Sequence, residues 1–151
     1  MQAVVCRFLP GLITLLALAG RPLAQQPITP IRMPAGTERW APVPGQPGVY
    51  QVVLDGDPTA PGIYTLRRRL PAGYYGPPHY HPHVEYATVI SGTLYVAFGD
   101  SLERAAAVAL PPGSFIRVSP FTAHAVWTEG EVILHFYGPG PRKVVNGTPP
   151  R

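Results

Sequence analysis

Hydrophobic and polar positions alternate along this chain in short stretches, most of which end near glycine, proline or aspartate. Residues 62–70 show the pattern well. The even-numbered positions carry Tyr64, Leu66 and Leu70, together with Arg68, and the residues between them are mostly polar. A period of two predicts strands, since successive side chains of a strand point to opposite faces. Further strands are predicted at residues 49–54, 84–90, 93–98, 108–110, 114–118, 124–128 and 132–137. About nine short strands joined by turns predict an all-β antiparallel sandwich or barrel.

Helical periodicity is absent from the sequence, and only residues 101–107 are expected to form one helical turn. The 151 residues include 21 prolines and 16 glycines, which fits short elements joined by turns. A chain of this length can bury the core of one domain.

The composition divides the chain into four segments. Residues 1–24 are predicted to be an export signal, because one positive charge precedes an apolar core at 8–19 that is too short to span a membrane. A buried N-terminal helix is the alternative. Residues 25–48 contain six prolines and predict an extended strap or a disordered leader. The barrel is expected at 49–138 and a polar tail at 139–151. The signal predicts a periplasmic or secreted protein.

The charge pattern argues against two classes of partner. Removing the signal with Arg7 and Arg21 leaves 10 basic and 8 acidic residues, a net charge of +2. Arg67, Arg68 and Arg69 alternate faces on a strand and cannot form one basic stripe, so no nucleic-acid binding is expected. No membrane span is expected after signal cleavage. Cys6, the only cysteine, lies in the signal, so the mature chain has no disulfide.

Three side chains that can bind a metal have the same parity in one stretch of the chain. They are His79, His81 and Glu85, and on extended backbone they project to one side. Two imidazoles and one carboxylate form a facial set that holds a divalent ion and leaves positions open. His124 is the best candidate for a fourth ligand. A set of nitrogen and oxygen atoms without sulfur suits Fe(II), Mn(II), Ni(II) or Zn(II).

With these residues the chain resembles the cupin superfamily. The first cupin motif is Gly, five residues, His-x-His, three or four residues, Glu, six residues, Gly. Every position is matched here, by Gly73, His79, His81, Glu85 and Gly92. The resemblance is to small single-domain bacterial cupins, and it implies one antiparallel jelly-roll β-barrel with a metal inside near one mouth. It also implies a homodimer.

The second cupin motif is matched in part. The motif is Gly, five residues, Pro-x-Gly, two residues, His, three residues, Asn. The spacing from Gly113 to His124 is kept, but Pro120 comes one residue late and Thr128 stands where the motif has Asn.

Two further residues are candidates for catalysis. If the face of strand 132–137 that carries His135 and Tyr137 is the inner one, either side chain lies near the metal and moves protons. The alternative is that this face is the outer one. Arg68 would bind a carboxylate if it pointed into the barrel, although a surface arginine is the commoner case.

Cupins with this ligand set include dioxygenases, decarboxylases, isomerases, lyases, sensor domains and storage proteins, so the fold leaves the reaction open. The resemblance implies an Fe(II)- or Mn(II)-dependent dioxygenase-type oxidoreductase acting on a small oxygen-rich substrate, with Zn(II) or Ni(II) as alternative ions. Two other functions remain open: a non-catalytic cupin that binds a metal or ligand for sensing or storage, and a metal-dependent lyase or isomerase. The cupin lyases that cleave sulfonium propionates carry a tyrosine where this chain has Ala87.

Overall fold

The computed structural model describes residues 31–99 and 102–150. The expected export signal at 1–24 lies outside the described residues. Within them the chain is built of strands and one short 3₁₀ turn, η1 (Arg104–Ala106). No helix in this part of the chain is long and apolar enough to cross a membrane. The strands are β1 (Ala41–Pro42), β2 (Tyr50–Asp55), β3 (Gly62–Leu70), β4 (Tyr75–Tyr80), β5 (Glu85–Ser91), β6 (Leu94–Phe98), β7 (Val108–Leu110), β8 (Phe115–Val118), β9 (His124–Thr128), β10 (Val132–Gly140) and β11 (Val145–Asn146).

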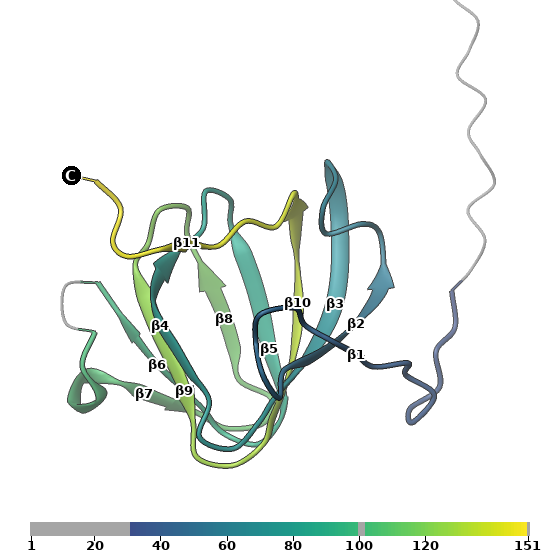
Figure 1. Ribbon diagram of the computed structural model, residues 1–151, viewed down its shortest axis with the longest axis horizontal. Coiled ribbons are helices and arrows are strands. Elements are labelled where there is room, and N and C mark those ends of the chain that lie inside the picture. The colour runs from purple at the N-terminus through teal and green to yellow at the C-terminus, as the bar shows by residue number, and fades with distance from the viewer. Residues whose placement is uncertain (1–30, 100–101, 151) are drawn as a thin grey trace, which may run out of the picture. The chain divides into compact units, whose positions relative to one another are not determined.

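The strands form two antiparallel sheets, as Figure 1 shows. The six-stranded sheet has the order β1-β2-β3-β10-β5-β8, and the five-stranded sheet has the order β11-β4-β9-β6-β7. From β3 to β11 the chain passes back and forth between the sheets, and only β6 and β7 are consecutive neighbours in one sheet. This is a jelly roll, and the predicted all-β antiparallel fold is confirmed.

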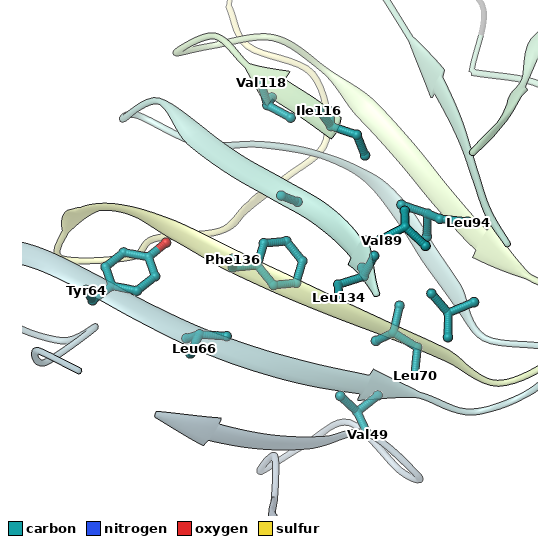
Figure 2. Packing of buried hydrophobic residues seen from close by; sticks show 12 residues of the cluster. Val49, Tyr64, Leu66, Leu70, Val89, Leu94, Ile116, Val118, Leu134 and Phe136 are labelled. Atoms are coloured by element: carbon teal, nitrogen blue, oxygen red, sulfur yellow. The ribbon is translucent and has the colours of Figure 1, made fainter. Parts of the chain in front are cut away.

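The core lies on the inner side of the six-stranded sheet and is made by the alternation seen in the sequence. In β3 the buried positions include Leu66 and Leu70, and in β10 they include Leu134 and Phe136. Figure 2 shows that these side chains project to the same side of neighbouring strands. Burial of each large apolar side chain contributes about 2 kcal/mol to stability.

Three side chains of residues 38–49, the segment that includes β1, contact the arginines of β3. Glu38 forms a salt bridge with Arg67. The guanidinium of Arg69 lies 5.3 Å from the ring centre of Trp40. Gln46 accepts a hydrogen bond of 2.8 Å from Arg68. The three consecutive arginines of β3 therefore alternate faces as expected, but Arg68 points into the barrel.

The C-terminal part of the chain continues both sheets. The sequence pattern predicts that the last strand stops at Gly138, but β10 continues through Pro139, which pairs with Ile63 of β3. The pairing of β10 with β5 ends at Tyr137. Proline has no N–H to donate, and it is tolerated at Pro139 because β5 no longer pairs with β10 there. The chain then adds β11, which pairs with β4. Figure 1 shows this segment crossing one end of the sheets.

The outer face of the five-stranded sheet is covered by the segment that contains η1. Trp127 is 3% exposed and packs there with Ala97 and Ala125. The guanidinium of Arg104 lies 5.6 Å from the ring centre of Trp127. The helical turn expected within 101–107 and the strand expected at 108–110 are both present, as η1 and β7.

Candidate metal centre

Three of the predicted ligands come together inside the barrel. His79 on β4 pairs directly with His124 on β9, and His81 follows β4 by one residue. One ligand atom from each histidine lies within 4.8 Å of the other two. His81 is 3% exposed and His124 is 4% exposed. The period-two placement of His79 and His81 thus brings two imidazoles to a third on the neighbouring strand.

Each histidine is held by a backbone carbonyl. Nδ1 of His79 lies 2.7 Å from Pro77 O, Nδ1 of His81 lies 2.8 Å from Lys143 O, and Nδ1 of His124 lies 3.0 Å from Thr122 O. A carbonyl oxygen only accepts hydrogen bonds, so the three Nδ1 atoms donate and carry the protons. In the neutral rings Nε2 is then the atom with a free lone pair, and such partners are typical of metal-binding histidines.

The environment favours the neutral form of His79 and of His124. Burial, followed by the neighbouring His79, lowers the pKa of His124 to about 4. Burial also lowers the pKa of His79. Nε2 of His81 is buried and has no hydrogen-bond partner. Neutral imidazole is the form that binds metals, and an unpaired buried nitrogen beside two similar ones is what a divalent ion would satisfy. The three histidines therefore fit a metal ion.

Glu85 lies beside this group but does not join it. Its Oε1 is 3.4 Å from Nε2 of His81, while its Oε2 is 2.7 Å from Nε of Arg142. Burial alone would raise the pKa of Glu85, but the positive charge of Arg142 outweighs it and the pKa falls below its usual value. The sequence predicts four ligands. The structure groups the three histidines and places the ionised carboxylate next to them, paired with Arg142.

Arg142 was not among the sequence candidates. It lies beyond the barrel expected at 49–138, in a segment without a strand pattern, and no spacing links it to Glu85. A basic residue after the last strand is too common a feature to single out a site.

His135 and Tyr137 do not reach the histidines. The neighbouring residues of β10, Leu134 and Phe136, line the inner cavity, so His135 and Tyr137 project from the opposite face. His135 is hydrogen-bonded through Nε2 to Thr65 on β3. Tyr137 stacks on Tyr86 with the ring centres 4.9 Å apart. The proposed catalytic role required His135 and Tyr137 to face inward. The structure corrects this expectation, because Leu134 and Phe136 form the face of β10 that packs into the core.

His83, the remaining histidine, is exposed and lies outside the group.

Two adjoining spaces lead to the histidines. The inner cavity has a volume of about 60 Å³ and is lined largely by aliphatic residues of both sheets. An outer hollow of about 580 Å³ lies between the turn at residues 45–47 and the C-terminal segment. Four residues line both spaces and so stand where they meet: Arg68, Tyr74, His79 and Arg142. A small molecule entering from the hollow would first meet Arg68, Arg142 and His79, one of the three grouped histidines.

Comparison with known proteins agrees with this site. Residues 66–137 match the family model of the cupin domain. Among solved structures, the polyketide cyclase RemF from Streptomyces resistomycificus is 17% identical, with a TM-score of 0.66 over 82% of this chain and 89% of that one. KdgF from a Halomonas species is 19% identical, with a TM-score of 0.54 over 68% and 86%. An RmlC-like cupin from Shewanella frigidimarina is 17% identical, with a TM-score of 0.56 over 70% and 86%. No curated protein sequence matches the chain.

The structural matches show the fold, and the family model matches the segment that carries His79, His81, Glu85 and His124. Residues 66–137 therefore form a small cupin domain.

Proposed function

We propose that the protein binds one divalent transition metal ion through Nε2 of His79, His81 and His124, and that it is a metal-dependent enzyme of the dioxygenase-type oxidoreductase class. Its substrate would be a small oxygen-rich molecule. The observation that carries the metal site is the hydrogen bonding of all three Nδ1 atoms to carbonyls, which leaves three Nε2 atoms together. A bound ion of this kind supplies Lewis-acid and redox chemistry.

Among the residues beside the histidines, Glu85 favours a cation at this place. The Glu85 carboxylate, held ionised by Arg142, adds a negative charge 3.4 Å from Nε2 of His81. In a buried site such a charge is poorly screened and attracts a cation more strongly than it would in water. The inner cavity beside the histidines has largely aliphatic walls.

Three protein ligands leave coordination positions open for a substrate, which supports an enzyme over a structural site. Fe(II) and Mn(II) are the ions that fit the oxidoreductase reading, because both accept nitrogen and oxygen ligands and take part in oxygen chemistry.

A non-redox reaction is the second candidate, and the pairing of Glu85 with Arg142 favours it. With its carboxylate engaged by a guanidinium, the site offers three imidazoles, a set that also suits Zn(II). A Zn(II) enzyme of this form would be a lyase or an isomerase.

The first experiment measures metal affinity by calorimetric titration of metal-free protein. We expect His79→Ala and His124→Ala to weaken binding by about 100-fold or more, because each removes one of three ligands. His83→Ala is the matched control, since His83 is exposed and outside the group. Unchanged affinity in His124→Ala would reject the site, provided that circular dichroism shows a native fold.

The second experiment separates the two reactions. Protein loaded with Fe(II), Mn(II) or Zn(II) is screened against diols, diketones and phenols while dissolved oxygen is recorded. Oxygen uptake with Fe(II) or Mn(II), lost in His124→Ala, supports the oxidoreductase. Turnover of a substrate by the Zn(II) form without oxygen supports the lyase or isomerase. Metal binding without turnover by any form would leave a binding module.

A further inference from the structure

Arg68 carries a charge in an unusual position. It lies on β3 between Leu66 and Leu70 and shares their inward face, and it is 7% exposed. A buried guanidinium loses its hydration and is destabilising unless an anion and hydrogen-bond acceptors replace the water.

The protein itself supplies little of that compensation. One N–H of Arg68 donates to Oε1 of Gln46 at 2.8 Å, and Gln46 is neutral. The Nε atom of Arg68 is buried and has no hydrogen-bond partner. Within the described residues Glu85 is the one buried carboxylate, and its salt bridge is with Arg142.

The charges at the junction of the two spaces are therefore unbalanced. Arg68 and Arg142 bring two positive charges, and Glu85 brings one negative charge. Burial and the nearby charge of Arg142 lower the pKa of Arg68 to about 10, which still leaves it protonated at pH 7. One positive charge remains without a counterion, and a divalent ion on the histidines would add to it.

The position of Arg68 tells what kind of anion fits. Arg68 lines both the outer hollow and the inner cavity, next to His79, so an anion can reach it from the hollow. Beyond it the cavity walls are aliphatic, including Leu94, Val96 and Leu134, and the volume is about 60 Å³. A ligand seated there presents one anionic group to Arg68 and a short, weakly polar remainder to the cavity.

We propose that Arg68 binds the carboxylate of a small organic acid, whose remainder extends past His79 into the inner cavity. This inference takes the cavity of the proposed function as its site and names the substrate class. Guanidinium and carboxylate match in a planar, two-hydrogen-bond arrangement. Arg68 is thus a binding and specificity residue.

The test uses butyrate as the probe and butyramide as its uncharged analogue, titrated into metal-free and Zn(II)-loaded full chain. Wild-type protein is expected to bind butyrate at least about tenfold more tightly than butyramide in both forms. Arg68→Met is expected to weaken butyrate binding by at least about tenfold, because the charged pair is lost while the apolar volume is kept. Arg69→Met is the control, since Arg69 is on the same strand but stacks outside on Trp40 and Tyr50.

Equal binding of butyrate and butyramide, equal binding by Arg68→Met, or no binding of butyrate to wild type would overturn the inference. If Arg68→Met does not fold, the same titration is followed in wild-type protein by the NMR resonance of the Arg68 Nε–H group. It shifts on addition of butyrate but not of butyramide if the inference holds. Failure of the metal site leaves a separate signature: Zn(II) does not bind, yet butyrate still binds to the metal-free protein in an Arg68-dependent way.

Discussion

The three histidines reach the same ligand geometry by contacts of different range. His79 and His124 each use a carbonyl two residues earlier in the chain, so their ring orientation is set locally, by the irregular part of β4 at Pro77 and by the segment before β9 at Thr122. His81 uses Lys143 O, which is 62 residues away. Two of the histidines are thus oriented by local contacts, and the third depends on the C-terminal segment being in place.

Neutral histidines make the metal-free protein sensitive to acid. The pKa of His124 is about 4 in the folded state, below the ordinary value of 6.5. Between these values the unfolded chain binds the proton and the folded chain does not, so the free energy of unfolding falls as the pH falls. From pH 6.5 to 4.5 His124 alone should remove roughly 2 kcal/mol. The lowered pKa values of His79 and His135 act in the same direction.

Urea unfolding of metal-free protein across this pH range measures the effect. Glu85 does not confuse it, because its lowered pKa makes its own loss of stability begin only below about pH 4.5. His124→Gln should flatten the pH dependence if it folds. An NMR titration that places the pKa of His124 near 6.5 would contradict the prediction.

At the scale of elements, the turn between β5 and β6 requires the glycine of the first motif. Gly92 has φ of 73°, and a Cβ there would overlap the carbonyl oxygen of Glu131 and come within 2.9 Å of Val132 Cγ2. The turn therefore packs directly on the start of β10. Gly113 also has a positive φ, 87°, but no atom lies within 4 Å of its Cβ position.

We predict that Gly92→Ala lowers the free energy of unfolding by at least about 3 kcal/mol, since strain and overlap act together. Gly113→Ala should lower it by only about 1 kcal/mol, because it adds the strain of the positive φ alone. Chemical denaturation of both variants checks the difference. Equal losses would show that the contact with Glu131 yields easily.

Most strands were predictable, but β1, β4 and β11 were not among the expected strands, and neither was it predictable which face of a strand points inward. Alternation in residues 132–137 defines a strand, yet both of its faces carry apolar or aromatic side chains, with Ile133 and Tyr137 on one and Leu134 and Phe136 on the other. Parity therefore divides the residues into two sets and does not tell which set faces the core. The inward position of Arg68 was the less favoured of two alternatives for a related reason, since a charged residue is usually exposed. Both assignments depend on contacts with the opposite sheet.

The departure from the second motif has a visible backbone counterpart. The motif spacing from Gly113 places its second glycine at residue 121, and the chain has Phe121 there. Phe121 adopts φ of 58°, a conformation that glycine takes without strain. Its N–H donates to His81 O at 2.8 Å, which holds the turn beside the metal-type histidines. The turn is therefore kept although its residue has changed.

At the scale of the molecule, both ends of the described chain meet at the mouth of the barrel. Gln46 holds Arg68 from the N-terminal side. Arg142 holds Glu85 and Lys143 O holds His81 from the C-terminal side. None of the three contacts could be predicted from the spacing of the motifs, because each involves a residue of the chain's terminal segments, which lie outside both motifs. The motifs provide the three histidines and Glu85, and the C-terminal segment accepts a hydrogen bond from His81 and forms a salt bridge with Glu85.

The last prediction removes the C-terminal contribution. A chain ending at Gly140 keeps the core strands but lacks Arg142, Lys143 and β11. We expect it to fold and to bind Zn(II) about 10- to 100-fold more weakly, because Nδ1 of His81 loses the acceptor that orients the ring. Loss of Arg142 should also raise the pKa of the buried Glu85 carboxyl and weaken the attraction for a cation.

A chain ending at Gly147 is the matched control, since it retains β11 and the hydrogen bond from Gly147 N–H to Pro78 O. Calorimetric titration of both truncated chains with Zn(II), after circular dichroism has shown native strands, measures the difference. If the chain ending at Gly140 binds Zn(II) as tightly as the control, the C-terminal segment only covers the barrel, and the orientation of His81 must come from β4 itself. If both chains bind weakly, the effect belongs to residues 148–151 and not to the contacts of Arg142 and Lys143. The predicted pattern, a loss confined to the shorter chain, would make the tail part of the metal site.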